Sequence, residues 1–163
     1  NERVPQALAQ LKGKLDFVVK HQAGAKNIKT AERFYKEANV NADVIPFIDD
    51  MAAAYGWADA VICRSGALTV SELAAAGVAA LLVPYPHAVD DHQTRNGEYL
   101  SNNGAAKLVQ QKDMTTESLA DLLLQSFADR QQLKQMAVKA RALAMTDATR
   151  KVVQQCLEVA SGK

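Results

Sequence analysis

The sequence predicts an α/β protein built on a doubly wound parallel sheet. Short apolar runs alternate along the chain with longer segments of helical periodicity. Residues 79–84 are apolar throughout, which is typical of a strand covered on both faces. Strands and helices that alternate at this spacing form parallel sheets with right-handed crossovers. The 163 residues suffice for one domain with a sizeable core, which we expect to span residues 1–163.

The elements are expected in a regular order. The predicted strands cover residues 15–20, 42–48, 59–63, 79–84 and 105–109. The predicted helices cover residues 4–12, 27–38, 51–57, 69–76, 92–102, 115–127, 129–144 and 147–160. Asp49 and Asp50 suit the N-terminus of the helix at 51–57, and Pro46 indicates that the second strand is an edge strand or ends early. Polar loops follow three strands, so we expect one sheet edge, where ligands bind, to gather residues 21–24, 64–68 and 87–93.

Residues 63–72, Cys-Arg-Ser-Gly-Ala-Leu-Thr-Val-Ser-Glu, are the most informative stretch. A strand ends there in a turn of small residues, which passes straight into a helix. Such a turn leaves free backbone N–H groups at the sheet edge, and these groups and the helix dipole favour a phosphate. Arg64 could neutralise a diphosphate or pair with a surface acid, and the carboxylate of Glu72 could reach sugar hydroxyls. The stretch predicts a nucleotide site, although Thr69 and Glu72 also fit the capping box of an ordinary helix.

The loop after residues 79–84 is crowded with polar side chains, namely His87, Asp90, Asp91, His92 and Gln93. Their spacing matches no zinc-binding pattern, so we expect no metal site. The amide of Gln93 can both donate to and accept from a pair of sugar hydroxyls. His92 also fits the start of a helix capped by Asp90 or Asp91.

The composition excludes several classes of protein. Hydrophobic residues make up 48% and charged residues 23%, which is ordinary for a globular domain and argues against disorder. The net charge is +1, from 19 basic and 18 acidic residues, so we expect no nucleic-acid partner. Cys63 and Cys156 lie outside any C-x-x-C pattern and are expected to be reduced thiols. No apolar stretch reaches the roughly 18 residues of a transmembrane helix and no secretory signal is visible, so the expected compartment is the cytosol.

Three segments together resemble the MurG family of UDP-N-acetylglucosamine:lipid I N-acetylglucosaminyltransferases. They are residues 47–51, residues 63–72, and residues 83–87 with Asp91-His92-Gln93 and Asn96. The resemblance runs from the first residue to the last helix, and the 63–72 stretch is highly specific. It implies a Rossmann-like domain, the C-terminal half of a GT-B glycosyltransferase, that binds UDP-GlcNAc. The family's glycine-rich turn would lie immediately before Asn1, and the N-terminal acceptor domain is expected outside this chain.

The resemblance implies a role for each matching residue. The backbone of Ile48 would pair with uracil, Glu72 would bind the ribose hydroxyls, and Gln93 would contact the sugar. The phosphate and ribose segment would comprise Ala67, Leu68, Thr69, Val70, Ser71 and Glu72, with the N–H groups of Leu68 and Thr69 near the diphosphate. Further contacts to the diphosphate or sugar are expected from Arg64, Ser65, Gly66, His92 and Asn96. No metal or cofactor is implied, and the general base is expected in the N-terminal domain.

The expected function is donor binding for a transferase that moves GlcNAc, with inversion, from UDP-GlcNAc to the muramoyl 4-hydroxyl of lipid I, forming lipid II. The full-length protein would be peripheral on the cytoplasmic face of the bacterial inner membrane, and this chain alone would be inactive. The alternative is a one-domain catalytic subunit of a two-chain lipid-linked UDP-GlcNAc transferase that docks on a membrane partner. A third hypothesis is a non-catalytic α/β binding module, in which the turn is only a helix cap.

Overall fold

Two parallel ladders form the centre of the computed structural model, which describes residues 1–161 apart from the side chain of Val89. Strand β1 (Lys20–Gln22) pairs with β2 (Asp43–Ile45). Strand β4 (Ala79–Leu82) lies between β3 (Ala60–Cys63) and β5 (Ala106–Leu108) in the second ladder. All the pairings are parallel, so the predicted α/β class with a parallel sheet is confirmed.

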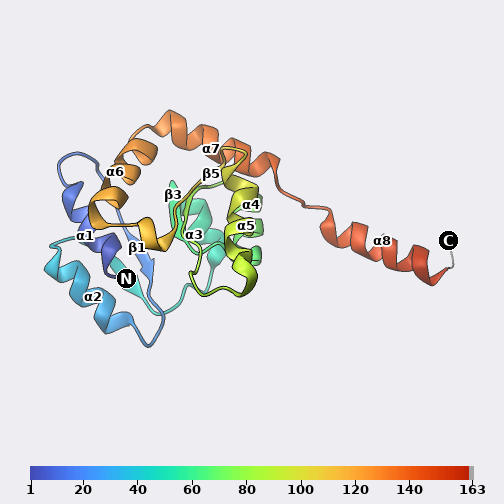
Figure 1. Ribbon diagram of the computed structural model, residues 1–163, viewed down its shortest axis with the longest axis horizontal. Helices are drawn as coiled ribbons and strands as arrows, with labels where there is room; N and C mark the ends of the chain where they lie inside the picture. The colour runs from blue at the N-terminus through green and yellow to red at the C-terminus, as the bar shows by residue number, and fades with distance from the viewer. Residues whose placement is uncertain (162–163) are drawn as a thin grey trace.

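Helices surround these strands in Figure 1. They are α1 (Arg3–Gln10), α2 (Ile28–Glu37), α3 (Met51–Trp57), α4 (Ala67–Ala76), α5 (His92–Ser101), α6 (Thr116–Phe127), α7 (Arg130–Ala142) and α8 (Ala148–Ala160). Two short 3₁₀ helices, Val89–Asp91 and Gln111–Asp113, precede α5 and α6. Helix α1 packs against α2 and α6, whereas α4 contacts α3, α5 and α7. The helices therefore form two groups, which are joined by a contact between α6 and α7.

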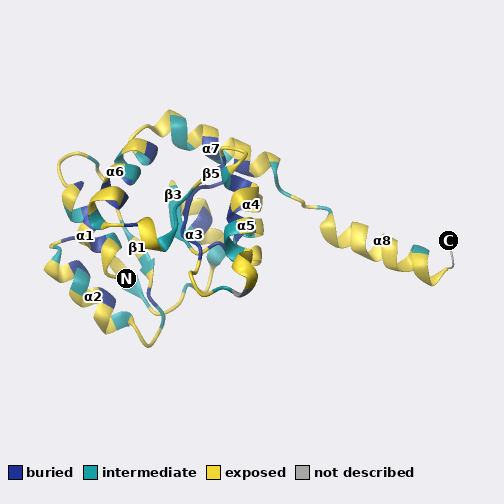
Figure 2. Cartoon of the chain, viewed as in Figure 1, coloured by how far each residue is buried: buried dark blue, intermediate teal, exposed yellow. Residues whose placement is uncertain are grey.

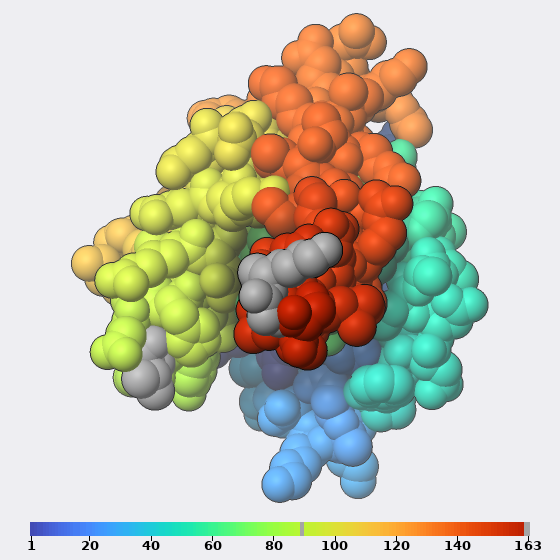
Figure 3. Space-filling model, turned by 90° about the vertical axis from the view of Figure 1, so that its right-hand side faces the viewer, coloured from blue at the N-terminus to red at the C-terminus, as the bar shows by residue number. Residues whose placement is uncertain are grey.

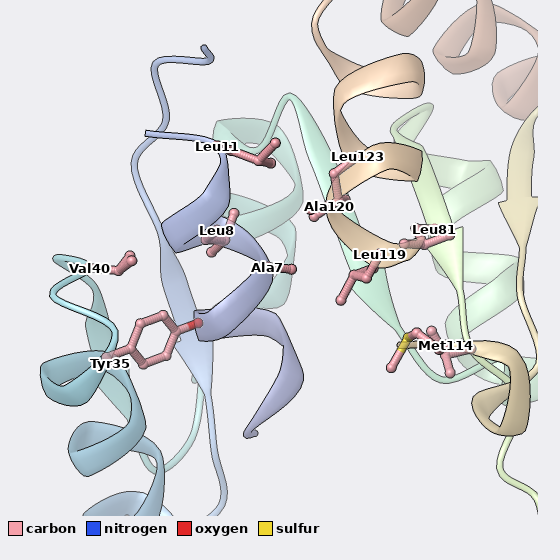
Figure 4. Close-up of a cluster of buried hydrophobic side chains, with 11 residues drawn as sticks. Ala7, Leu8, Leu11, Tyr35, Val40, Leu81, Met114, Leu119, Ala120 and Leu123 are labelled. Carbon is pink, nitrogen blue, oxygen red and sulfur yellow. The ribbon is translucent and has the colours of Figure 1, made fainter. Parts of the chain in front are cut away.

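Strand β4 separates two apolar clusters. All four of its residues are buried, and Figure 2 shows it among the darkest parts of the molecule. Leu81 belongs to the cluster under α1 and α6, with Leu8, Leu119 and Leu123, and Figure 4 shows these side chains with others of the cluster. Leu82 belongs to the other cluster, with Leu73 of α4 and Leu100 of α5. Because successive strand residues face opposite sides of a sheet, the unbroken apolar run of residues 79–84 does mark a strand covered on both faces.

The first predicted strand is placed too early. Residues 15–19 form no ladder, and β1 begins only at Lys20, so His21 and Gln22 lie in a strand and not in a loop. Leu15, Phe17 and Val19 still pack against the first cluster at every second position. The alternation of apolar and polar residues therefore predicted correctly which side chains are partly buried. Only the last residues of the segment pair with β2. Strand β2 ends at Ile45, as the early stop at Pro46 predicted.

Helix α8 extends away from the rest of the molecule in Figure 1 and points toward the viewer in Figure 3. None of its residues is buried, and Val152, Val153, Leu157 and Val159 are all exposed. Of the helices within residues 1–161, none is both long enough and apolar enough to cross a membrane.

Candidate nucleotide site

The turn between β3 and α4 exposes backbone donors at the start of a helix. Gly66 is the N-cap residue, in an extended conformation with φ −62° and ψ 149°, and the first helical hydrogen bond runs from Val70 N–H to the Gly66 carbonyl at 2.9 Å. The N–H groups of Ala67, Leu68 and Thr69 therefore have no acceptor among the described residues. No acidic side chain lies in the first turn of α4 to offset the positive end of its dipole. This geometry suits an anion.

The capping-box interpretation of this stretch is wrong. Helix α4 begins at Ala67, two residues before the predicted start, and Thr69 lies inside its first turn. No side chain of the described residues caps the helix. Gly66 can take the N-cap position without a side-chain oxygen, which leaves the backbone donors of the first turn to an external acceptor.

The turn is supported from behind by α5. Ser65 is fully buried, and its carbonyl accepts a hydrogen bond from Asn96 Nδ2 at 3.2 Å. Gly97 follows, and a Cβ atom there would lie only 3.3 Å from the Ser65 Cβ. Ser65 and Asn96, both predicted as ligand contacts, are thus placed where they hold the turn in position. Gly97 was not predicted, because its close approach to the turn is visible only in three dimensions.

Glu72 is paired with a residue that the sequence analysis did not select. The hydroxyl of Tyr55, on α3, donates to Glu72 Oε2 at 2.9 Å. Tyr55 is only 9% exposed, and burial together with the neighbouring carboxylate raises the pKa of its hydroxyl. Glu72 is half-buried one turn into α4, and Tyr55 leaves its Oε1 without a hydrogen bond in the part of the chain described.

Arg64 lies against the end of β4. Its Nη1 donates to the carbonyls of Val83 and Pro84 at 3.1 and 2.9 Å, and its Nη2 donates to Gln111 Oε1 at 2.6 Å. The guanidinium also lies over the ring of Tyr85, 5.5 Å from its centroid. The hydrogen bonds of Arg64 thus go to two carbonyls and an amide oxygen and not to a surface acid among the described residues, and a diphosphate would have to draw it away from these carbonyls.

The polar loop before α5 is held by its own side chains. Gln93 Oε1 accepts from the N–H of Tyr85 at 3.0 Å, and Asp91 Oδ1 accepts from Thr94 Oγ1 at 2.6 Å. Asp91 is the N-cap residue of α5, but its side chain caps no backbone N–H. His92 is the first residue of the helix. In residues 1–161 we find no group of three or more acidic, histidine or cysteine side chains that could hold a metal ion.

The backbone of Ile48 lies just before α3. Its N–H donates to Gln22 Oε1, at the end of β1, over 2.9 Å. Phe47 beside it is 65% exposed. Asp50 then caps α3 by accepting from the Ala53 N–H at 2.8 Å, as predicted. Helix α3 thus links the two parts of the site, since Ile48 precedes it and its Tyr55 reaches Glu72.

The start of α4 is exposed at Ala67 and Leu68. A separate cavity of about 510 Å³ lies between α5, β5 and α7 and shares no lining residue with the groups described above. That cavity lies at the far end of α5, beside Lys107 and Lys139. It is therefore separate from the β3–α4 turn, where the first-turn backbone donors of α4 lie.

Comparison with known proteins identifies the family of this chain. The model of the glycosyltransferase family 28 C-terminal domain matches residues 1–153. The chain belongs to this family. Two curated relatives are named UDP-N-acetylglucosamine–N-acetylmuramyl-(pentapeptide) pyrophosphoryl-undecaprenol N-acetylglucosamine transferase. The one from Marinobacter nauticus is 57% identical over 99% of this chain and 45% of its own length, and the one from Cupriavidus necator is 59% identical over 98% and 44%.

Two solved structures share the fold of this family 28 domain. The crystal structure of Acinetobacter baumannii MurG superimposes with a TM-score of 0.88 at 49% identity, over 94% of this chain and 44% of that one. The glycosyltransferase VinC, solved in complex with dTDP, superimposes with a TM-score of 0.65 at 20% identity, over 91% of this chain and 36% of VinC. This is a likeness of fold alone. The resemblance to the C-terminal part of MurG-type transferases is thus confirmed, and the chain spans a little under half the length of the curated relatives it matches.

Proposed function

We propose that this chain binds UDP-GlcNAc for a transferase that moves GlcNAc to the muramoyl 4-hydroxyl of lipid I and forms lipid II. The observation that carries the proposal is the start of α4. Three backbone N–H groups that have no acceptor within residues 1–161 lie there at the end of a parallel strand, in a chain that matches lipid-linked GlcNAc transferases over nearly its whole length. A helix N-terminus of this kind is an anion site, and a diphosphate is the anion of the proposed donor.

The proposed contacts divide into three parts. The N–H groups of Ala67, Leu68 and Thr69 would bind the diphosphate, and Glu72 would accept from the ribose hydroxyls. The backbone of Ile48 would pair with uracil once its N–H exchanges Gln22 for the base. Gln93, at the start of α5, would contact the sugar after releasing the Tyr85 N–H. We assign no catalytic base to this chain.

The rest of the reaction is proposed to need the part of the relatives' length that this chain does not span. Transfer requires an acceptor hydroxyl and a base held against the anomeric carbon, and such positioning contributes several kcal/mol to catalysis. We propose inverting transfer on the cytoplasmic face of the inner membrane, with the exposed apolar side chains of α8 contacting the other domain. This chain alone would then bind donor weakly and transfer nothing.

Calorimetric titration with UDP-GlcNAc, followed by a transfer assay with a lipid-linked acceptor in detergent, tests the proposal. We expect measurable heat on titration and no transferred sugar. Addition of a separately made acceptor domain from a relative should restore a trace of transfer. Absence of binding would contradict the donor site, and robust transfer by the chain alone would favour a self-sufficient catalytic subunit.

A further inference from the structure

We infer that Tyr55 is a positioning residue for nucleotide binding, because its hydroxyl fixes the carboxylate of Glu72 so that Oε1 is presented to the ribose hydroxyls. The inference rests on the proposed function, since it names a second residue that the ribose contact requires. Tyr55 itself would not touch the nucleotide.

The geometry of the pair supports this role. Tyr55 is buried in the apolar cluster that includes Leu73 and Leu82, which restrains its ring. Its hydroxyl lies 2.9 Å from Glu72 Oε2. Helices α3 and α4 contact each other, so the pair ties together the helix that follows Ile48 and the helix that carries the phosphate donors. A rigid aromatic donor therefore restrains a flexible carboxylate.

The direction of the hydrogen bond is also fixed. Burial and the adjacent carboxylate raise the pKa of Tyr55, so the hydroxyl keeps its proton at neutral pH. Tyr55 is then the donor, and Glu72 accepts through Oε2. The remaining oxygen, Oε1, accepts no hydrogen bond within residues 1–161, so it is left for an outside donor such as a sugar hydroxyl. A glutamate that is already oriented loses less side-chain freedom when the nucleotide binds.

The experiment compares two ligands, UDP and 2′,3′-dideoxy-UDP, which lacks both ribose hydroxyls. The ratio of their dissociation constants measures the ribose contact and is insensitive to the phosphate and the base. The variants are Tyr55→Phe, Glu72→Gln and the double variant. Tyr35→Phe is the matched control, because Tyr35 is also buried and its hydroxyl also makes a 2.9 Å hydrogen bond, to His21 Nδ1.

We expect the unaltered chain to prefer UDP by about tenfold or more, the value of a hydrogen bond to a charged group. Tyr55→Phe should reduce that preference about threefold to tenfold, because the Glu72 carboxylate remains but loses its fixed orientation, and leave the affinity for the dideoxy ligand unchanged. Glu72→Gln should reduce the preference at least as far, and the double variant should add nothing further. Tyr35→Phe should keep the full preference.

Several results would overturn the inference. Equal losses of affinity for both ligands in Tyr55→Phe would show that the hydroxyl only supports the fold. An unaltered chain that binds UDP and the dideoxy ligand equally would remove the ribose contact while leaving the phosphate site in place. A chain that binds neither ligand would contradict the proposed function itself, and this inference with it.

Discussion

Replacing Ala67 with proline would remove one backbone N–H from the proposed phosphate site and leave the helix intact. Ala67 is the first residue of α4, the position at which proline is favoured. Gly66 before it has ψ 149°, the extended conformation that a residue preceding proline prefers. The Ala67 side chain is exposed and its N–H has no acceptor among residues 1–161, so the substitution breaks no hydrogen bond and overfills no core.

The expected loss follows from the single missing donor. A hydrogen bond to a charged group is worth about 1.5–3 kcal/mol, and the openness of the turn favours the lower end. Ala67→Pro should therefore weaken UDP binding roughly tenfold, since about 1.4 kcal/mol corresponds to a factor of ten. Calorimetric titrations with UDP and with uridine separate the phosphate from the nucleoside, and uridine should bind both chains equally. The melting temperature should stay the same or rise.

Arg130→Pro is the matched control. Arg130 is the first residue of α7, the N-cap Asp129 before it is also extended, with ψ 107°, and the Arg130 ion pair with Asp59 is fully on the surface. This variant should bind UDP as the unaltered chain does. Unchanged UDP affinity in Ala67→Pro would refute the reasoning, because its N–H would then not donate to the phosphate. A parallel loss of uridine binding would also refute it, since the phosphate would not be the group affected.

Three further predictions concern specificity, stability and pH. If Ile48 reads uracil, UDP should displace bound UDP-GlcNAc whereas ADP and GDP should not, because unmatched polar groups disfavour the wrong base; equal displacement by all three would remove the uracil contact. Gly77 ends α4 with φ 66°, which alanine rarely adopts, so Gly77→Ala should lower the free energy of unfolding by about 1–2 kcal/mol. Gly56 lies inside α3 with open space around it, so Gly56→Ala should raise the free energy of unfolding by about 0.5–1 kcal/mol. Urea titrations in which both substitutions change the free energy in the same direction would contradict this. Burial lowers the pKa of His21, so the unfolded chain takes up a proton more readily, and the free energy of unfolding should fall as the pH drops through about 6.5. That fall should be smaller in His21→Gln, and an equal fall in both chains would assign the pH dependence to other groups.

Local sequence patterns predicted the helices and strands well, but they predicted less well which strands pair. The bounds of α3, 51–57, are those predicted, because Asp50 supplies the cap that the sequence indicated. Apolar and polar residues alternate over residues 15–19 as they do in a strand, yet no pattern within the segment indicates its pairing partner. Only Lys20–Gln22 pair with β2. Helix α4 was predicted two residues late because Thr69 and Glu72 imitate a capping box, whereas a glycine cap leaves no side-chain signal.

The residues of the candidate site also fall into those that the sequence indicated and those that only the structure shows. The stretch from Ser65 to Glu72 could be selected from its order of small residues, a hydroxyl and a carboxylate after an apolar strand. Tyr55 could not, because the small residues of α3 are fully explained by close packing and the contact with Glu72 joins positions 17 residues apart. Gly97 was missed for the same reason, as its approach to Ser65 joins α5 to the turn. Contacts between elements carry no local pattern.

The hydrogen bonds within the proposed site indicate which part of it is preformed. The Ile48 N–H is bonded to Gln22 and the Gln93 amide to Tyr85, so a base or a sugar must exchange one hydrogen bond for another. Such an exchange yields little net free energy, since bonds are lost as well as gained. The first-turn donors of α4 have no acceptor within residues 1–161, so an anion breaks no hydrogen bond of the described chain there, and the helix dipole favours that anion. The diphosphate should therefore anchor the nucleotide, while Ile48, Glu72 and Gln93 determine which nucleotide-sugar stays bound.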